Sequence, residues 1–166
     1  MNPKSLSARY DARPVEDGDV EAILSLMRSN PQYYRHCPPE PSEKTVAHDR
    51  VVLPPRNVPA DKYYLCFWDK DTPVAVLDLI LRCPNAETAF IGFFMMNAAY
   101  QGKGEGSELI GEILAELAKE YRFVRLMVVI TNEQAKHFWS KNGFVPTGLV
   151  LEQPEYTTEV RERKLR

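Results

Sequence analysis

Apolar side chains recur along this chain with two different periods, and each change of period separates one predicted element from the next. Within residues 17–31 they fall at positions 20, 23, 24 and 27, the spacing of a helix with one buried face. Acidic residues crowd the start of this segment, and Pro31 follows its end. We therefore expect a helix here, preceded by a short edge strand within residues 8–15.

Two more helices are predicted in the second half of the chain. From Ser107 onward, apolar residues occupy one face and acidic residues the other, which predicts a helix that starts near Gly106. Residues 131–143 predict another helix, with a capping box formed by Thr131 and Gln134 at its start and Gly143 as its stop. The apolar stripe of the first of these helices contains Leu109, Ile110, Ile113, Leu114, Leu117 and Tyr121.

Six longer runs have the composition of β-strands, because β-branched and aromatic residues dominate them and turn residues separate them. The first three are close together in sequence, which predicts antiparallel hairpins. The fourth is almost continuously apolar, as in a strand covered on both faces. The six runs are residues 62–68, 73–81, 88–96, 123–130, 144–152 and 155–165.

The segment between the first helix and these strands carries seven of the thirteen prolines, in residues 31–59. A weak helix within residues 42–52 is the only regular element expected there, and the remainder is expected to be a packed loop. The full order is β-α-α-βββ-α-β-α-ββ. It predicts a single domain over residues 1–166 with a mixed α/β fold of about seven strands and four helices.

Composition narrows the functional classes. The chain has 166 residues, of which 44% are hydrophobic and 27% charged, and its net charge is −2. A nucleic-acid partner is not expected, since phosphate-backbone binding needs a basic excess. No apolar run approaches the length of a membrane helix and the N-terminus lacks a signal sequence, so we expect no membrane partner and a cytoplasmic location. The three cysteines and three histidines show no metal-ligand spacing, so no metal is expected.

The segment Gln101–Ser107 is the strongest candidate for chemistry, because three of its residues are glycines and a helix begins at its end. Helix N-termini present unpaired N–H groups that suit a phosphate, and glycine lets the backbone approach the ligand. Lys103 adds a positive charge. The dinucleotide and P-loop patterns do not fit the spacing, and a plain helix-starting loop is the alternative interpretation.

The pattern that fits is Q-x-x-G-x-G, and here the sequence resembles the GCN5-related N-acetyltransferase (GNAT) superfamily. The resemblance continues through the following helix and strand, Asn132, and the run AKHFWSKNGF, and it spans about residues 63–150. It implies a mostly antiparallel sheet with a splayed strand pair that holds the cofactor. It also implies acetyl-coenzyme A (acetyl-CoA) as the co-substrate.

The resemblance also implies roles for individual residues. Phe94, Met95 and Met96 are expected to contact the pantetheine arm through main-chain atoms, and Asn132 to bind the same arm. Trp139 is expected to lie at the cofactor, where many relatives have a tyrosine that protonates the leaving thiolate. An indole cannot serve as that acid. The residues expected at the pyrophosphate are Gln101, Gly102, Lys103, Gly104, Glu105, Gly106 and Ser107.

Glu105 departs from the small aliphatic residue that is common in the family at this position. A carboxylate beside a pyrophosphate is unfavourable unless it points to solvent or pairs with Lys103. We also expect Gly104 and Gly106 to keep the backbone bare at the pyrophosphate, and Gly102 to ease the turn.

Two residues are candidates for acid–base catalysis. Asp78 interrupts the apolar run 73–81, where a charge is costly unless it is paired or functional. Its structural alternatives are a solvent-facing position or an ion pair with Arg82 or Arg125. Tyr156 is a second candidate, in the C-terminal hairpin.

Two functional hypotheses remain. The first is transfer of an acetyl group from acetyl-CoA to an amine of a small molecule or peptide. The second is a non-catalytic acyl-CoA-binding sensor or assembly module. The resemblance also makes a homodimer an expectation, since relatives often form one.

Overall fold

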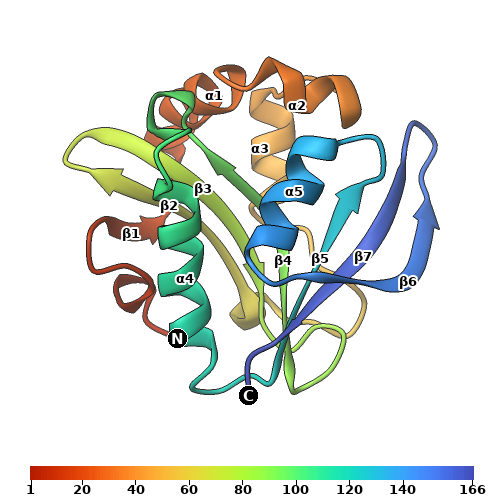
Figure 1. The fold of residues 1–166 in the computed structure, drawn as a ribbon. Helices are drawn as coiled ribbons and strands as arrows, with labels where there is room; N and C mark the ends of the chain where they lie inside the picture. Colours follow the sequence, from red (N-terminus) through yellow and green to blue (C-terminus); the bar gives the residue numbers. More distant parts are fainter.

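The computed structural model describes residues 1–166, which form one seven-stranded sheet with helices on both faces (Figure 1). The strand order is β1-β2-β3-β4-β5-β7-β6, and every neighbouring pair is antiparallel except β4 and β5. The strands are β1 (Asp11–Pro14), β2 (Lys62–Asp69), β3 (Thr72–Ile80), β4 (Thr88–Met96), β5 (Phe123–Val129), β6 (Val145–Glu152) and β7 (Thr157–Lys164). The helices are α1 (Val20–Arg28), α2 (Pro31–His36), α3 (Glu43–Asp49), α4 (Glu105–Leu117) and α5 (Glu133–Lys141).

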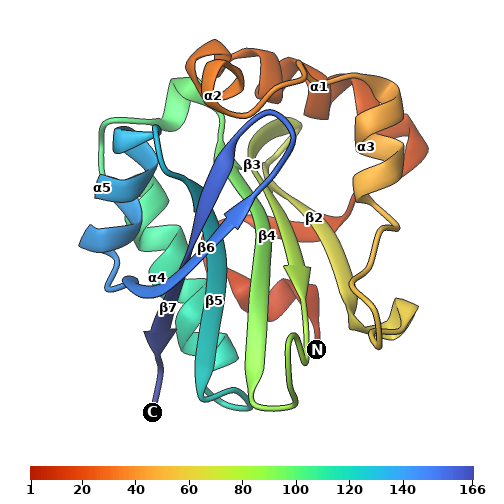
Figure 2. The ribbon, with the colours of Figure 1, turned by 90° about the vertical axis from the view of Figure 1, so that its right-hand side faces the viewer.

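Two apolar cores lie on opposite faces of the sheet. The larger core packs α4 and the α5 residue Trp139 against one face, and the smaller core packs α1 and α3 against the other. Figure 2 shows α4 and α5 on one side of the sheet, α3 on the opposite side, and α1 and α2 across its upper end. No helix of the structure combines the length and the apolar character that crossing a membrane requires.

The mixed α/β fold and the predicted order of strands are confirmed. The stripe on α4 is buried as expected from Leu109 to Leu117, whereas Tyr121 is buried beyond the end of the helix. The prediction of one helix in residues 31–59 is wrong, because α2 precedes α3 there. Pro31 stands at the first position of α2, where its fixed φ favours a helix start, so this proline begins a helix as well as following one.

The predicted capping box of α5 is also wrong. The N-cap is Asn132, whose side-chain oxygen accepts a hydrogen bond from the Ala135 N–H at 3.0 Å. Thr131 lies one residue earlier, and its hydroxyl is 2.9 Å from Nδ1 of His36 on α2. Asparagine and threonine are both good N-caps, so the sequence alone did not select between neighbouring positions.

The separation of β4 and β5 is the feature that creates the site. Their parallel ladder spans only four residue pairs, from Thr88 with Phe123 to Ile91 with Leu126. Beyond Ile91, β4 keeps its pairing with β3 and β5 keeps its pairing with β7. The centre of the sheet therefore opens towards the carboxyl ends of β4 and β5, as the resemblance implied.

Candidate active site

A largely apolar cleft fills the opening between β4 and β5. Both strands, α5 and one residue of α2 form its walls, so it passes through the plane of the sheet. Its lining consists of Tyr33, Ile91, Gly92, Phe93, Phe94, Leu126, Met127, Val128, Val129, Asn132, Ala135 and Trp139.

The ladder between β3 and β4 determines which main-chain groups of β4 face this cleft. The Asn97 N–H donates to the Val74 carbonyl at 2.8 Å, and hydrogen-bonding positions alternate along an antiparallel pair. The main-chain groups of Met95 are therefore directed to β3, and those of Phe94 and Met96 to the open side. Of the three residues expected to offer main-chain atoms, Phe94 and Met96 have the required orientation.

The Met96 carbonyl already has two partners. It accepts from Nδ2 of Asn30 at 2.9 Å and from Nε2 of Gln101 at 3.0 Å. Nε2 of Gln101 also donates to Oδ1 of Asn30 at 2.5 Å. These bonds fix the end of β4 to Asn30, the N-cap of α2, so that Met96 offers its N–H, and not its carbonyl, to a ligand.

The loop from Gly102 to Ser107 has the property that an anion site needs. None of the six consecutive backbone N–H groups of these residues has a hydrogen-bond partner within the protein, and the first helical bond of α4 is from Glu108 to the Gly104 carbonyl. Such a run at a helix N-terminus attracts a phosphate through its donors and through the helix dipole. The residues present therefore fit a pyrophosphate.

The glycines of this loop have different roles. Gly102 and Gly104 have φ values of +81° and +86°, in the left-handed region, and a Cβ at either would meet nothing within 4 Å. Gly106 has a packing role, because its Cβ would lie 3.3 Å from Cγ of Met96 and 3.3 Å from Cε2 of Phe138. Its N–H also belongs to the unpartnered run, and the expectation that Gly106 keeps the backbone bare at the pyrophosphate stays a prediction.

The side chain of Glu105 turns away from the loop. It forms an ion pair with Arg9 at 3.2 Å and accepts a hydrogen bond from the Tyr10 hydroxyl. Neither alternative considered for the sequence, solvent or Lys103, is its partner. Lys103 is exposed, and the hydroxyl of Ser107 accepts from Nδ2 of Asn142 at 3.2 Å.

Asn132 and Trp139 both line the cleft from α5. Asn132 is buried, and while its oxygen caps the helix, no hydrogen bond involves its Nδ2. The Trp139 indole packs edge-on against Phe94, Phe138 and Phe144, with ring centroids 5.0–6.0 Å apart. Trp139 thus supplies an apolar wall.

Asp78 is buried on β3 and paired with neither arginine named as an alternative. Its partner is Lys62, whose Nζ lies 2.7 Å from Oδ1, whereas Arg82 pairs with Asp61 and Arg125 with Glu162. Burial raises the pKa of Asp78 to about 6, against the opposing effect of Lys62. A carboxyl with this pKa is suited to proton transfer near neutral pH.

Tyr156 immediately precedes β7 and interacts with Cys37, just after α2. Burial, together with the neighbouring thiol of Cys37, raises the pKa of Tyr156 to about 12. Burial likewise raises the pKa of Tyr33, which also interacts with Cys37 and lines the cleft. Tyr156 therefore keeps its proton at neutral pH and approaches the α2 side of the cleft.

Sequence reasoning missed Asn30, Lys62 and Gly92. Asn30 carried no signal beyond its position at a helix end, and Lys62 is a lysine at the start of a strand, normally a solvent-facing position. Gly92 was detectable, because a glycine inside a strand often marks a bulge or a close contact.

The sequence comparison identifies the family. The family model described as the acetyltransferase (GNAT) family matches residues 23–144, and the chain belongs to this family. No curated protein is similar enough in sequence to count as a match.

Solved structures share the fold at low sequence identity. An acetyltransferase from Thermus thermophilus superposes with a TM-score of 0.73 at 23% identity, over 93% of this chain and 96% of that one. The spermidine N-acetyltransferase from Vibrio cholerae, in complex with CoA and spermine, has a TM-score of 0.69 at 19% identity and coverages of 96% and 97%. The ribosomal-protein-S18-alanine N-acetyltransferase from Escherichia coli gives 0.67 at 15% identity, over 94% of each chain.

Proposed function

We propose that this protein transfers the acetyl group of acetyl-CoA to an amine of a small molecule or peptide. The observation that carries the proposal is the run of six unpartnered N–H groups from Gly102 to Ser107, next to the cleft between β4 and β5. The first feature suits a pyrophosphate and the second an extended, mostly apolar arm. Family membership and the amine acceptors of the spermidine and alanine N-acetyltransferases support this assignment.

The chain supplies a position for each part of the donor. Residues Gly102–Ser107 bind the diphosphate through their backbone N–H groups, with Lys103 adding charge, whereas the N–H of Gln101 already donates to the Ala98 carbonyl. The main chains of Phe94 and Met96, with Asn132, bind the arm, and Trp139 closes the apolar wall. In the reaction itself, acetyl-CoA supplies an activated thioester, and the Met96 N–H is the donor directed to the negative charge that develops on its carbonyl oxygen.

Other side chains are proposed for acid–base catalysis. Asp78 is the proposed base that takes a proton from the acceptor ammonium, which makes its nitrogen nucleophilic. Tyr156 keeps its proton at neutral pH, so it is the proposed acid for the departing thiolate in place of the tyrosine that Trp139 replaces. Water is an alternative proton source there, because a thiol is acidic enough to leave as a thiolate.

The alternative function is a non-catalytic acyl-CoA-binding sensor or assembly module. The specific observation that favours it is that residue 139 is a tryptophan, where many relatives have the tyrosine that protonates the leaving thiolate. A homodimer and a cytoplasmic location stay predictions from the sequence. The structure gathers no group of three or more His, Cys, Asp or Glu side chains suited to a metal ion.

A thiol-release assay separates the two functions. The protein is incubated with acetyl-CoA and a panel of polyamines, amino acids, small amines and peptides, and free CoA thiol is measured against an enzyme-free control. An acetyltransferase raises thiol release with at least one amine class. Tight binding of acetyl-CoA without amine-dependent release supports the sensor, and absence of binding contradicts both.

A further inference from the structure

Lys62 and Asp78 form a buried ion pair next to Gly92, a residue that lines the cleft. The side chains of Lys62 and Asp78 are only 5% and 9% exposed, and Lys62 Nζ is 2.7 Å from Oδ1 and 2.9 Å from Oδ2 of Asp78. Only the contact to Oδ2 has hydrogen-bond geometry, so Oδ1 is buried without a hydrogen bond. A carboxylate in this state has unused capacity to accept a proton.

Gly92 lies between this carboxylate and the cleft. It belongs to β4, close to an irregularity in the β3–β4 ladder, and it lines the cleft. A Cβ on Gly92 would be 2.7 Å from Oδ2 of Asp78, a distance that real atoms do not tolerate. Asp78 therefore occupies the space that a side chain at position 92 would take, and its carboxylate lies against the cleft wall at Gly92.

The surroundings make the ionised form of Asp78 depend on one cation. Lys62 on β2 is its ion-pair partner, and Asp49 on α3 acts in the opposite direction by raising the pKa of Asp78. Tyr64, its cross-strand neighbour on β2, is buried, and its hydroxyl lacks a partner. Tyr34 and Cys66 are further neighbours of Tyr64, and burial raises the pKa of Tyr34, Tyr64 and Cys66, so all three keep their protons at neutral pH.

Stability alone does not account for the pair. A buried ion pair contributes little or no net stability compared with apolar residues of similar volume, because both charges lose their hydration. The rest of β3 from Val74 to Ile80 consists of buried apolar side chains. A charged pair at this one position, next to a glycine (Gly92) on the neighbouring strand that leaves room for it, indicates a chemical role.

We propose that Lys62 is a positioning residue that keeps the Asp78 carboxylate ionised against Gly92, where it takes the proton of the acceptor amine. The step converts an ammonium and a carboxylate into a neutral amine and a carboxylic acid. The amine nitrogen then attacks the thioester carbonyl and the carbon–sulfur bond breaks. The nitrogen loses its second proton as the departing CoA thiolate takes one up, and the proton on Asp78 passes to solvent. This inference rests on the proposed acetyl transfer.

The first test is the pH dependence of kcat/KM for the amine in wild type, Lys62→Met and Lys62→Arg. Without the lysine, Asp78 holds its proton to higher pH, so the acid limb of Lys62→Met is expected about one pH unit or more above that of wild type. For a shift of one pH unit, its kcat/KM falls about twofold at pH 7 and about fivefold at pH 6, and it recovers by pH 9. Lys62→Arg keeps the cation, and its acid limb stays close to that of wild type.

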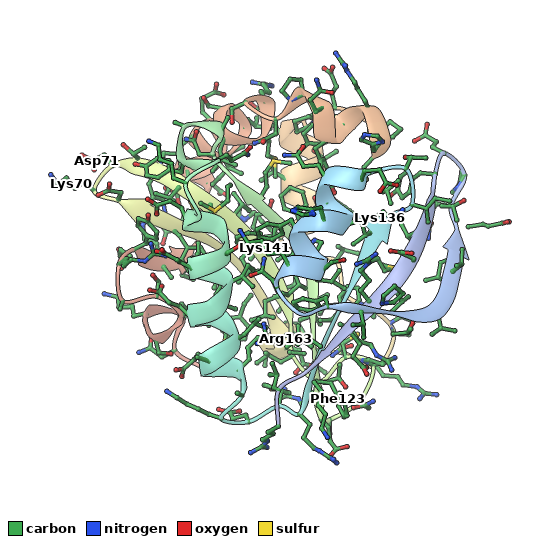
Figure 3. All side chains as sticks on the ribbon, viewed as in Figure 1. Lys70, Asp71, Phe123, Lys136, Lys141 and Arg163 are labelled. Atoms are coloured by element: carbon green, nitrogen blue, oxygen red, sulfur yellow. The ribbon has the colours of Figure 1, made fainter.

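The matched control is Lys70→Met, which makes the same chemical change at the exposed tip of the β2–β3 hairpin, far from the cleft (Figure 3). It should leave the profile unchanged. A uniform loss in Lys62→Met at every pH, or an equal shift in Lys62→Arg, overturns the proposal in favour of a structural role.

A second measurement is independent of turnover. Carbon-13 NMR titration of the Asp78 carboxyl, assigned with Asp78→Asn, reports its protonation in wild type, Lys62→Arg and Lys62→Gln. A midpoint that rises in Lys62→Gln supports the proposal, and an unchanged midpoint overturns it. If wild type acetylates no amine, the proposed acetyl transfer fails, while this titration still decides whether Lys62 controls Asp78.

Discussion

Replacing Gly104 with valine tests the loop as an anion site. The residue has φ +86°, and nothing lies within 4 Å of an added Cβ, so the cost is conformational and not a clash. A left-handed conformation costs an ordinary residue about 1–2 kcal/mol, and more if the side chain is β-branched. Any relaxation of this φ changes the orientation of the neighbouring N–H groups.

The expected loss of affinity follows from the donors affected. A hydrogen bond to a charged group contributes about 1.5–3 kcal/mol, so the loss of one N–H from the phosphate site weakens CoA binding about 10- to 150-fold. Isothermal titration calorimetry with CoA measures this directly, since CoA carries the diphosphate and cannot be turned over. Thermal melting measures the accompanying cost to the fold.

The chain contains a matched control. Gly148 in β6 has φ +89° and also has nothing within 4 Å of an added Cβ, but it lies in the distal hairpin. Gly148→Val should lower the melting temperature by a similar amount and leave the CoA affinity unchanged. An unchanged Kd in Gly104→Val, or an equal loss in both variants, refutes the assignment of the loop to the diphosphate.

Three further predictions concern Glu105, Gly92 and Asp78. Glu105→Gln should lower stability by no more than about 1 kcal/mol, because the ion pair with Arg9 is lost. The variant should bind CoA slightly more tightly, because a negative charge near the loop is removed. Weaker binding measured by calorimetry contradicts this prediction. Gly92→Ala should lower the free energy of unfolding in urea by about 1–3 kcal/mol through its contact with Asp78, and an equal cost in an Asp78→Ala background shows that the two residues are not coupled. Because the pKa of Asp78 is raised to about 6, the folded chain takes up this proton at a higher pH than the unfolded chain, so stability from this group grows as pH falls from about 6 to about 4. The melting temperature of wild type relative to Asp78→Asn should therefore be higher at about pH 4.5 than at about pH 7.5, and the opposite order excludes the raised pKa.

The elements that the sequence predicted are those with long, regular patterns. The apolar stripe of α4 and the β-rich runs of β2 to β5 each satisfy one period over many residues, so local preference and burial agree. The helix α2 was missed because it has only six residues, none fully buried, and begins at a proline. No periodic signal can build up over so short a segment.

The residues of the candidate site also differ in how far a local sequence pattern could predict them. The loop Gly102–Ser107 could be predicted as an anion site because that proposed function depends on glycine, which is visible in the sequence. Lys62 as the partner of Asp78 was not found, because the contact joins strands β2 and β3 across 16 positions and depends on register. The orientation of Glu105 towards Arg9 joins residues 96 positions apart and left no local trace.

The main-chain origin of the loop donors has a consequence for how this protein can evolve. A substitution can delete a side-chain ligand, but no substitution other than proline deletes a backbone N–H. Lys103 and Glu105 can therefore change in charge without loss of the donors, and Glu105 is tolerated because its side chain turns to Arg9. The proposed roles of Asp78 and Lys62 have no such protection, because they depend on side chains. Under the proposed function, the donor-binding loop is therefore less sensitive to side-chain substitution than the residues proposed to act on the acceptor.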